Sequence, residues 1–87
     1  MNIDQIWRNI QLHEGETFYT KRGIQYRYVM YRDCFLVNDD KKRRVTKESL
    51  EKALTIENPT PSKINNRGIW APSYIYGIIT DERIRNA

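Results

Sequence analysis

Residues 24–38 read IQYRYVMYRDCFLVN, and no other part of the chain constrains the predicted fold as strongly. The first half of this segment alternates its side chains with a period of two, which is typical of a strand that buries one face. We expect one set of alternating side chains to face the core and the other to face the open side of a sheet. The core set is Ile24, Tyr26, Tyr28 and Met30, and the open set is Gln25, Arg27, Val29 and Tyr31.

Two further strands are predicted beside this segment. Residues 17–20 combine β-branched and aromatic side chains, which strands prefer, and residues 34–38 follow a turn at Arg32-Asp33. Lys21-Arg22-Gly23 supplies the other turn, because glycine adopts a positive φ without strain. The sequence therefore predicts a three-stranded antiparallel meander.

Helix signals stand on both sides of the meander. Residues 2–11 carry one apolar stripe at helical spacing, with Asn2 as the N-cap. A second helix begins after the N-cap Thr46, where Val45 can pack against Leu50 as a hydrophobic staple. This helix must end before Asn58-Pro59, because the residue before a proline disfavours helical backbone.

Residues 57–69 are predicted as a long loop, because they hold two prolines, two adjacent asparagines and a glycine. A third helix is predicted over residues 73–84, with Pro72 in its first turn. A strand over residues 74–80 is the alternative, since every residue there except Gly77 favours β-structure.

These elements give a single α+β domain, residues 1–87, with the order α-β-β-β-α-α. The three helices are expected to pack on one face of the three-stranded antiparallel meander. A chain of 87 residues buries roughly 60–65% of its unfolded surface, which leaves room for one thin core.

Charge is concentrated in the middle of the chain. The formal net charge is +4 and the pI is about 9.4. Residues 21–54 hold ten cations and five anions, a local net charge of +5. Such a surface fits either a polyanionic partner or a solvated basic face.

Cysteine usage and hydropathy limit the class of protein. Cys34 is the single cysteine, which excludes an intrachain disulfide. Because His13 is the single histidine, a Cys/His zinc site is excluded too. No apolar run approaches the ~20 residues of a membrane helix, and no apolar signal-peptide core is present at the N-terminus. We therefore expect a cytoplasmic protein with no membrane partner and no cofactor or metal.

The basic run 39–44, Asp-Asp-Lys-Lys-Arg-Arg, gives the sharpest functional hypothesis, which is binding to nucleic acid. It lies between the third strand and the second helix, where a loop can present it. Acidic residues on both sides can neutralise part of it. The candidate nucleic-acid-binding cations are Lys21, Arg22, Arg27, Lys41, Lys42, Arg43, Arg44 and Lys47.

Aromatic residues offer a second kind of nucleic-acid contact. Tyr19, Tyr31 and Trp70 can stack on unpaired bases, although packing in the sheet or core is the alternative for the tyrosines. For Trp70 we favour a position as the lid of the core. If Trp70 is instead exposed beside the loop 57–69, these residues are the natural contact of a protein–protein adaptor, which is the second functional hypothesis.

Catalysis is the least favoured hypothesis, and we expect no enzymatic activity. A Cys34–His13 pair can form a nucleophile only if the fold joins the two, and a cysteine in a thin sheet is usually a small buried hydrophobe. Four carboxylates can in principle bind a divalent metal if two loops meet at one end of the sheet. These are Glu14, Glu16, Asp39 and Asp40.

Three segments together resemble a known domain: residues 14–23 with Tyr26 and Tyr28, residues 45–54 and residues 72–84. They are similar to a small uncharacterised bacterial domain found in stand-alone proteins of bacteria and their mobile elements, and in segments attached to nucleases. The resemblance implies a helix over residues 73–84 and favours a nucleic-acid role, and it implies no catalytic residues. That domain has a glycine before the proline of the last segment, where this chain has Ala71.

Overall fold

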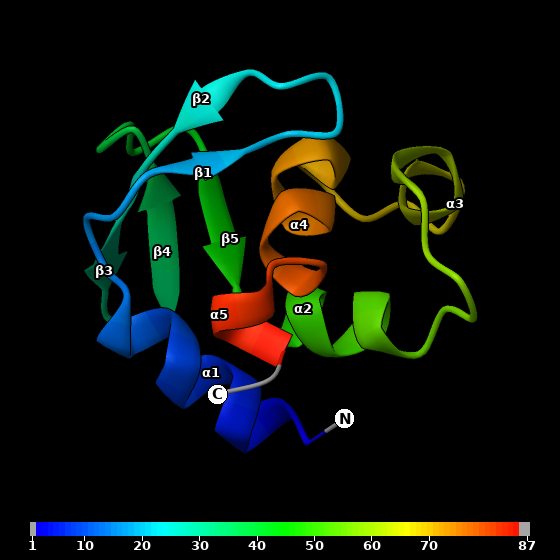
Figure 1. The fold of residues 1–87 in the computed structure, drawn as a ribbon. Coiled ribbons are helices and arrows are strands. Elements are labelled where there is room, and N and C mark those ends of the chain that lie inside the picture. The colour runs from blue at the N-terminus through cyan, green and yellow to red at the C-terminus, as the bar shows by residue number, and fades with distance from the viewer. Residues whose placement is uncertain (1, 86–87) are drawn as a thin grey trace.

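The structure, a computed structural model, describes residues 2–85. Figure 1 shows a mixed fold in which helices cover one face of a small antiparallel sheet and a short hairpin lies beside them. The α+β class is confirmed. Within the described residues there are two sheets and five helices, so the predicted meander and helix count are wrong. In chain order the elements are α1 Ile3–Leu12, β1 Phe18–Tyr19, β2 Gln25–Tyr26, β3 Tyr28–Tyr31, β4 Cys34–Val37, β5 Arg44–Thr46, α2 Lys47–Leu54, α3 Pro61–Asn66, α4 Pro72–Ile79 and α5 Glu82–Arg85.

The predicted strand 24–31 is divided at Arg27 into β2 and β3. β2 pairs with β1, with Phe18 opposite Tyr26, whereas β3 pairs with β4 in the other sheet. At the break, the backbone N–H of Arg27 donates to Oδ1 of Asn38 (3.1 Å), and the N–H of Asn38 donates to the carbonyl of Arg27 (2.7 Å). The chain therefore changes pairing partners at Arg27, and the β1–β2 hairpin packs on α4 instead of extending the larger sheet.

The predicted core face is only partly confirmed. Tyr26 and Tyr28 are buried, and Met30 is half-buried. Ile24 is 59% exposed, so its assignment to the core is wrong. It lies in the turn before β2, where its N–H donates to Oγ1 of Thr20 and its carbonyl accepts from the N–H of Thr20. Those bonds fix the turn and leave the Ile24 side chain outside the alternation of β2.

The strand β5 lies where the sequence predicted a loop. Val45 is opposite Phe35 of β4 and is buried, while both its neighbours in β5 are exposed. One buried residue among three is too short a pattern to recognise beside four cations. α2 follows β5 directly, and Thr46 caps it as predicted, with its Oγ1 accepting from the N–H of Ser49 at 3.1 Å.

The predicted loop 57–69 contains the short helix α3. Thr60 is its N-cap and accepts from the N–H of Lys63 at 3.1 Å, while Pro61 occupies the first turn. A cap followed by proline is a helix-start signal. The hydrophobic pattern does not reveal this helix, because it has six residues and buries only Ile64, so it carries no periodic stripe.

Residues 73–84 are helical rather than extended, as predicted, but they form two helices. α4 ends at Ile79, and the hydroxyl of Thr80 donates to the carbonyl of Tyr76 at 2.6 Å. Asp81 then accepts from the N–H of Arg83 at 2.9 Å, which stabilises the start of α5. Two side chains that bond to nearby backbone groups thus interrupt the predicted single helix.

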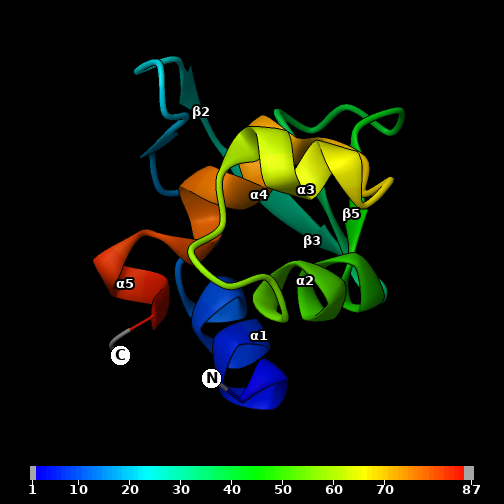
Figure 2. The same cartoon turned by 90° about the vertical axis from the view of Figure 1, so that its right-hand side faces the viewer.

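The core joins the first and last helices of the chain. Asn2 caps α1 as predicted, accepting from the N–H of Asp4 at 2.8 Å. The buried amide of Asn9 donates to the carbonyl of Ile84 at 2.6 Å, so α1 and α5 are hydrogen-bonded side by side (Figure 2). None of the helices in residues 2–85 combines the length and apolar character that crossing a bilayer requires.

Ala71 stands before α4 in a left-handed conformation, with φ 59° and ψ 47°. This conformation costs an L-residue roughly 1–2 kcal/mol and costs glycine little. We expect Ala71→Gly to raise the free energy of unfolding by about 0.5–1 kcal/mol, since glycine's greater freedom in the unfolded chain offsets part of the gain. Urea denaturation measures the change, and an unchanged or lower midpoint contradicts the assigned conformation.

Candidate functional site

The turn between β1 and β2 carries two of the predicted cations. The backbone of Thr20 bonds to Ile24 and to Gly23, whose φ of 85° closes the turn. Lys21 and Arg22 are exposed at its tip. The Nζ atom of Lys21 lies 5.9 Å from the centroid of the Tyr76 ring, so a cation–π contact joins this turn to α4.

The turn between β4 and β5 carries most of the basic run. Asp40 organises it, because its Oδ1 accepts from the N–H of Lys42 at 2.9 Å and its Oδ2 lies 3.6 Å from Nε of Arg43. Only Arg43 is therefore neutralised locally. Within residues 2–85, Lys41, Lys42 and Arg44 have no ion-pair partner.

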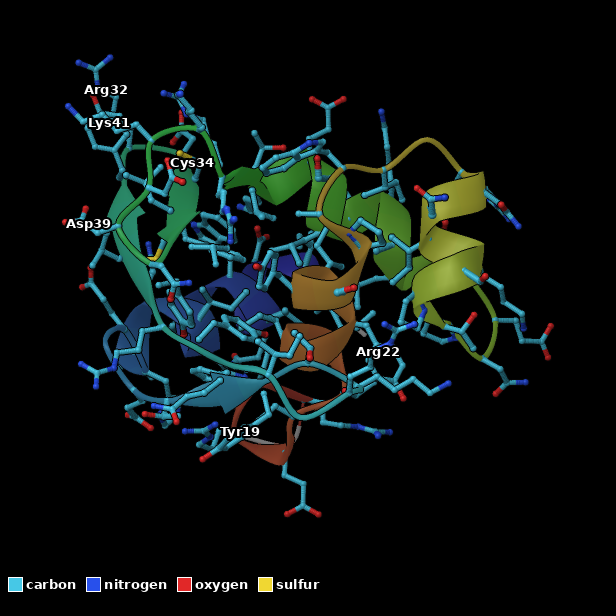
Figure 3. All side chains as sticks on the ribbon, turned by 90° about the horizontal axis from the view of Figure 1, so that it is seen from above. Tyr19, Arg22, Arg32, Cys34, Asp39 and Lys41 are labelled. Atoms are coloured by element: carbon cyan, nitrogen blue, oxygen red, sulfur yellow. The ribbon has the colours of Figure 1, made fainter. Side chains whose placement is uncertain are left out.

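The helix α4 joins the two basic turns. Nη1 of Arg43 donates to the hydroxyl of Tyr74 at 2.7 Å, and its Cζ lies 5.8 Å from the centroid of that ring. Tyr74 thus contacts the β4–β5 turn, while Tyr76, two residues later, contacts Lys21 of the β1–β2 turn. Figure 3 looks down on this end of the molecule, with Arg22 and Lys41 on opposite sides of the view. We call the two turns and residues 72–76 of α4 the basic end.

A groove at the basic end runs between the β1–β2 turn, the start of α3 and the start of α4. It has a volume of about 790 Å³. We call it the α4 groove. Its lining residues are Thr20, Lys21, Arg22, Ile24, Thr60, Pro61, Ser62, Ser73 and Tyr74.

Tyr31 and Arg44 lie on the open face of the larger sheet, away from the basic end's groove. Val29 and Tyr31 lie outside the core cluster, as predicted. The ring of Tyr31 is half-buried and is contacted by two guanidinium groups, those of Arg32 at 5.4 Å and Arg44 at 5.8 Å. Arg32 was not predicted as a site residue. Its turn carried no basic run to mark it.

The remaining predicted aromatic residues are exposed. Tyr19 is 57% exposed and Trp70 is 53% exposed. The assignment of Trp70 as the lid of the core is therefore wrong. Trp70 lies between Ile69, which is buried, and the left-handed Ala71, and this sharp change of direction turns the indole outward.

Two of the predicted cations, Lys47 and Arg27, are not part of the two basic turns. Lys47 lies at the far end of β5, in α2, and its Nζ pairs with Oδ1 of Asp4 at 2.8 Å. Arg27 is exposed at the break between β2 and β3, where its backbone is bonded to Asn38 beside the β4–β5 turn. Lys47 therefore lies outside the candidate site, and Arg27 lies at its margin.

The candidate catalytic groups Cys34 and His13 each contact other residues rather than one another. Cys34 is buried, with its Sγ 3.0 Å from the carbonyl of Tyr31, whereas His13 pairs with Glu16 at 2.8 Å. The carboxylate of Glu14 accepts from the N–H of Met30. In the described part of the chain, no three metal-ligating side chains gather.

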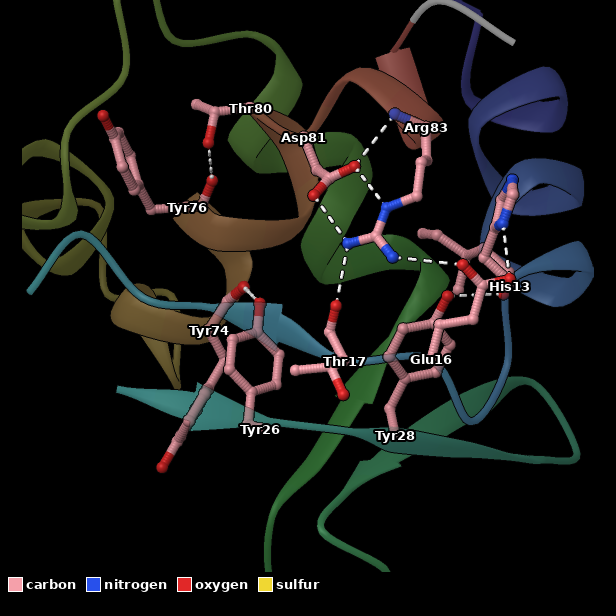
Figure 4. Close-up of polar contacts among 11 residues, drawn as sticks. His13, Glu16, Thr17, Tyr26, Tyr28, Tyr74, Tyr76, Thr80, Asp81 and Arg83 are labelled. Carbon is pink, nitrogen blue, oxygen red and sulfur yellow. Dashed lines mark hydrogen bonds and ion pairs between the residues drawn. The ribbon is translucent and has the colours of Figure 1, made fainter. Parts of the chain in front are cut away.

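Two carboxyl groups whose pKa values are lowered, Asp81 and Glu16, take part in contacts that hold the fold together and lie outside the basic end. The hydrogen bond from Arg83 holds the pKa of Asp81 below its ordinary value, against a smaller opposing effect of burial. The pKa of Glu16 is lowered chiefly by its hydrogen bond with His13, and also by Arg83. Figure 4 shows the guanidinium of Arg83 between these carboxylates and the carbonyl of Thr17. This is a packing arrangement that ties α5 to the segment before β1.

Tyr74 and Tyr76 are the residues of the basic end that the sequence did not reveal. Both lie in the helical segment, where the sequence pattern places Tyr74 on one apolar stripe with Ile75, Ile78 and Ile79 and so suggests packing rather than binding. The available signal was a pair of tyrosines two positions apart in a helix, since such a pair cannot be buried on one face.

Comparison with known proteins finds no matching family model, no matching curated protein and no matching solved structure.

Proposed function

We propose that the chain binds nucleic acid without catalysing a reaction on it, and that the basic end is the binding surface. The observation that carries this proposal is the pair of cation–aromatic contacts on α4. Lys21 lies on Tyr76 and Arg43 on Tyr74, so cations distant in sequence are placed on either side of one helix. A nucleic-acid strand that lies along α4 therefore contacts both turns.

The balance of charge at the basic end supports a polyanion as the partner. Lys21, Arg22, Lys41 and Lys42 are exposed and have no ion-pair partner within residues 2–85. Each phosphate that such a cation neutralises steepens the fall of log K with log salt by about 0.7–0.9. We therefore expect a modest affinity that depends strongly on salt, with little preference for sequence.

The proposal is tested with Lys41→Ala/Lys42→Ala and labelled single- and double-stranded DNA and RNA. At low salt we expect the double variant to lose at least tenfold in affinity, and its salt slope to fall by roughly 1.4–1.8. Fluorescence anisotropy at several salt concentrations measures both quantities. Because both side chains are exposed, stability should change by no more than about 0.5 kcal/mol.

The matched control is Arg8→Ala/Arg67→Ala, which removes the same formal charge from α1 and from the end of α3. Both residues are exposed and unpaired within residues 2–85. We expect this variant to bind nearly as the wild type does. An equal loss in both double variants means that net charge alone matters, which contradicts the basic end as the site. No binding to any nucleic acid at low salt rejects the proposal.

One observation favours a protein-interaction module as the second candidate function. The indole of Trp70 is 53% exposed beside the start of α4, and exposed aromatic residues of this kind are enriched among interface hot spots. A stoichiometric protein partner that survives nuclease treatment and is lost in Trp70→Ala supports this function. Retention of that partner by Trp70→Ala argues against it.

A further inference from the structure

The α4 groove differs in charge from four other grooves of the described chain. Lys21 and Arg22 are its only ionisable residues besides Tyr74, and none of its nine lining residues is acidic. Four other grooves are each lined by at least one carboxylate, among them Glu48, Glu57 and Asp39. The charge of the lining therefore favours an anion in the α4 groove over the others.

The same groove is rich in hydroxyl groups. The Oγ1 atoms of Thr20 and Thr60 accept hydrogen bonds from backbone N–H groups, which leaves each hydroxyl hydrogen able to donate. Ser62 and Ser73 are exposed at its edge. Hydroxyl donors beside two cations match a phosphate group, which accepts several hydrogen bonds and carries negative charge.

Apolar surface completes the lining. Ile24 is 59% exposed, and Pro61 and Tyr74 also line the groove. Tyr74 is held in place, because its ring packs edge-on against Tyr26 with 5.0 Å between centroids. A volume of about 790 Å³ lies in the range of small-ligand sites. Inorganic phosphate can contact only the cations and hydroxyl groups of the groove, whereas a nucleotide can contact these and the apolar residues as well.

We propose that the α4 groove binds one nucleotide, with its phosphate at Lys21 and Arg22 and its base or sugar against Ile24 and Tyr74. In its biological setting this inference rests on the proposed function, since the nucleotide would belong to a bound strand. Lys41 and Lys42 do not line the α4 groove, so the two proposals can be tested with different variants.

The test follows backbone amide shifts by NMR during titration with thymidine 5′-monophosphate, thymidine or inorganic phosphate. We expect saturable shifts at residues 20–24, 60–62 and 73–74 with the nucleotide. Phosphate should bind at least several-fold more weakly, and thymidine should produce no saturable shift. Shifts that do not saturate, or that follow the exposed cations of the whole surface, overturn the inference.

Four variants distinguish a specific site from a general effect of charge. Arg22→Ala should weaken nucleotide binding at least tenfold, and Arg22→Lys should restore part of it because the charge remains. Arg67→Ala, at the end of α3 and outside the groove, should bind as the wild type does. Ser62→Ala, which keeps every charge, should weaken binding several-fold. Equal effects of Arg22→Ala and Arg67→Ala overturn the inference.

The outcomes distinguish the two proposals. Oligonucleotide binding without nucleotide shifts in the groove rejects the groove site and leaves the proposed function intact. Nucleotide binding in the groove without oligonucleotide binding supports the groove site and rejects the proposed function.

Discussion

Replacing Gly77 by alanine is expected to lower the free energy of unfolding by about 1–3 kcal/mol. Gly77 lies where α4 crosses β1. A Cβ atom there would stand 2.5 Å from the hydroxyl of Tyr26 and 2.6 Å from the backbone carbonyl oxygen of Tyr19. The carbonyl belongs to the paired strand β1 and cannot move alone, so either β1 or α4 must shift.

An opposing effect makes this prediction informative. Alanine favours helix over glycine by about 0.8–1 kcal/mol, so a helix free of neighbours would gain stability from the change. The sign of the change in the free energy of unfolding therefore reports how closely β1 approaches α4. Thermal unfolding measures it, since each kcal/mol shifts the Tm of a domain this size by roughly 4–8 °C.

A double variant tests the cause. Tyr26→Phe removes the hydroxyl that the new Cβ would meet, together with its 2.9 Å hydrogen bond to the carbonyl of Tyr74. The cost of Gly77→Ala should be smaller in the Tyr26→Phe background than in the wild type, although the clash with Tyr19 remains. A Gly77→Ala protein more stable than the wild type would show that the crossing is looser than described.

Arg83→Ala is expected to cost about 1–3 kcal/mol at neutral pH, because one guanidinium holds several partners. It donates to both carboxylate oxygens of Asp81 at 2.9 Å, to Glu16 at 3.1 Å and to the carbonyl of Thr17 at 2.9 Å. Its Cζ lies 3.9 Å from the centroid of the Phe18 ring. The variant loses all these contacts, and with them the attachment of α5 to the segment before β1.

This loss should depend on pH in a defined direction. The pKa of Asp81 is lower in the folded protein than its ordinary value of 3.8, chiefly because of the hydrogen bond from Arg83. A depressed carboxyl pKa contributes stability above the unfolded pKa, and that contribution disappears as pH falls through the folded pKa. The difference between the wild type and Arg83→Ala should therefore be largest near neutral pH and shrink as pH falls below 3.8.

Arg85→Ala is the matched control, because Arg85 lies in the same short helix, is exposed and makes no ion pair within residues 2–85. Urea unfolding at neutral and acidic pH measures both variants. Arg85→Ala should stay within about 0.5 kcal/mol of the wild type. Equal losses in the two variants, or a loss in Arg83→Ala that does not change with pH, contradict the role of the Arg83 contacts.

Local signals in the sequence predicted local structure well. The caps Asn2 and Thr46 depend only on residues two or three positions away, and both are confirmed. The helical choice for residues 73–84 and the burial of Tyr26 and Tyr28 likewise follow from short-range pattern.

Features that depend on distant residues were not predictable in this way. The break at Arg27 is made by Asn38, which provides both hydrogen bonds from another turn. The contact of Arg43 with Tyr74 joins residues 31 positions apart, and Arg43 lies in the turn before β5 rather than near α4 in sequence. A charge run can suggest a binding surface from composition, but the composition does not say which helix the surface lies on.

The hydrogen bond between Asn9 and Ile84 also decides how the chain can be attached to something else. It holds α1 beside α5 at one end of the molecule, and both basic turns lie at the opposite end (Figures 1 and 2). A linker, tag or neighbouring domain joined through α1 or α5 therefore stands clear of the basic end. Tethering on a surface by either helix should present the basic end outward in a nearly uniform orientation.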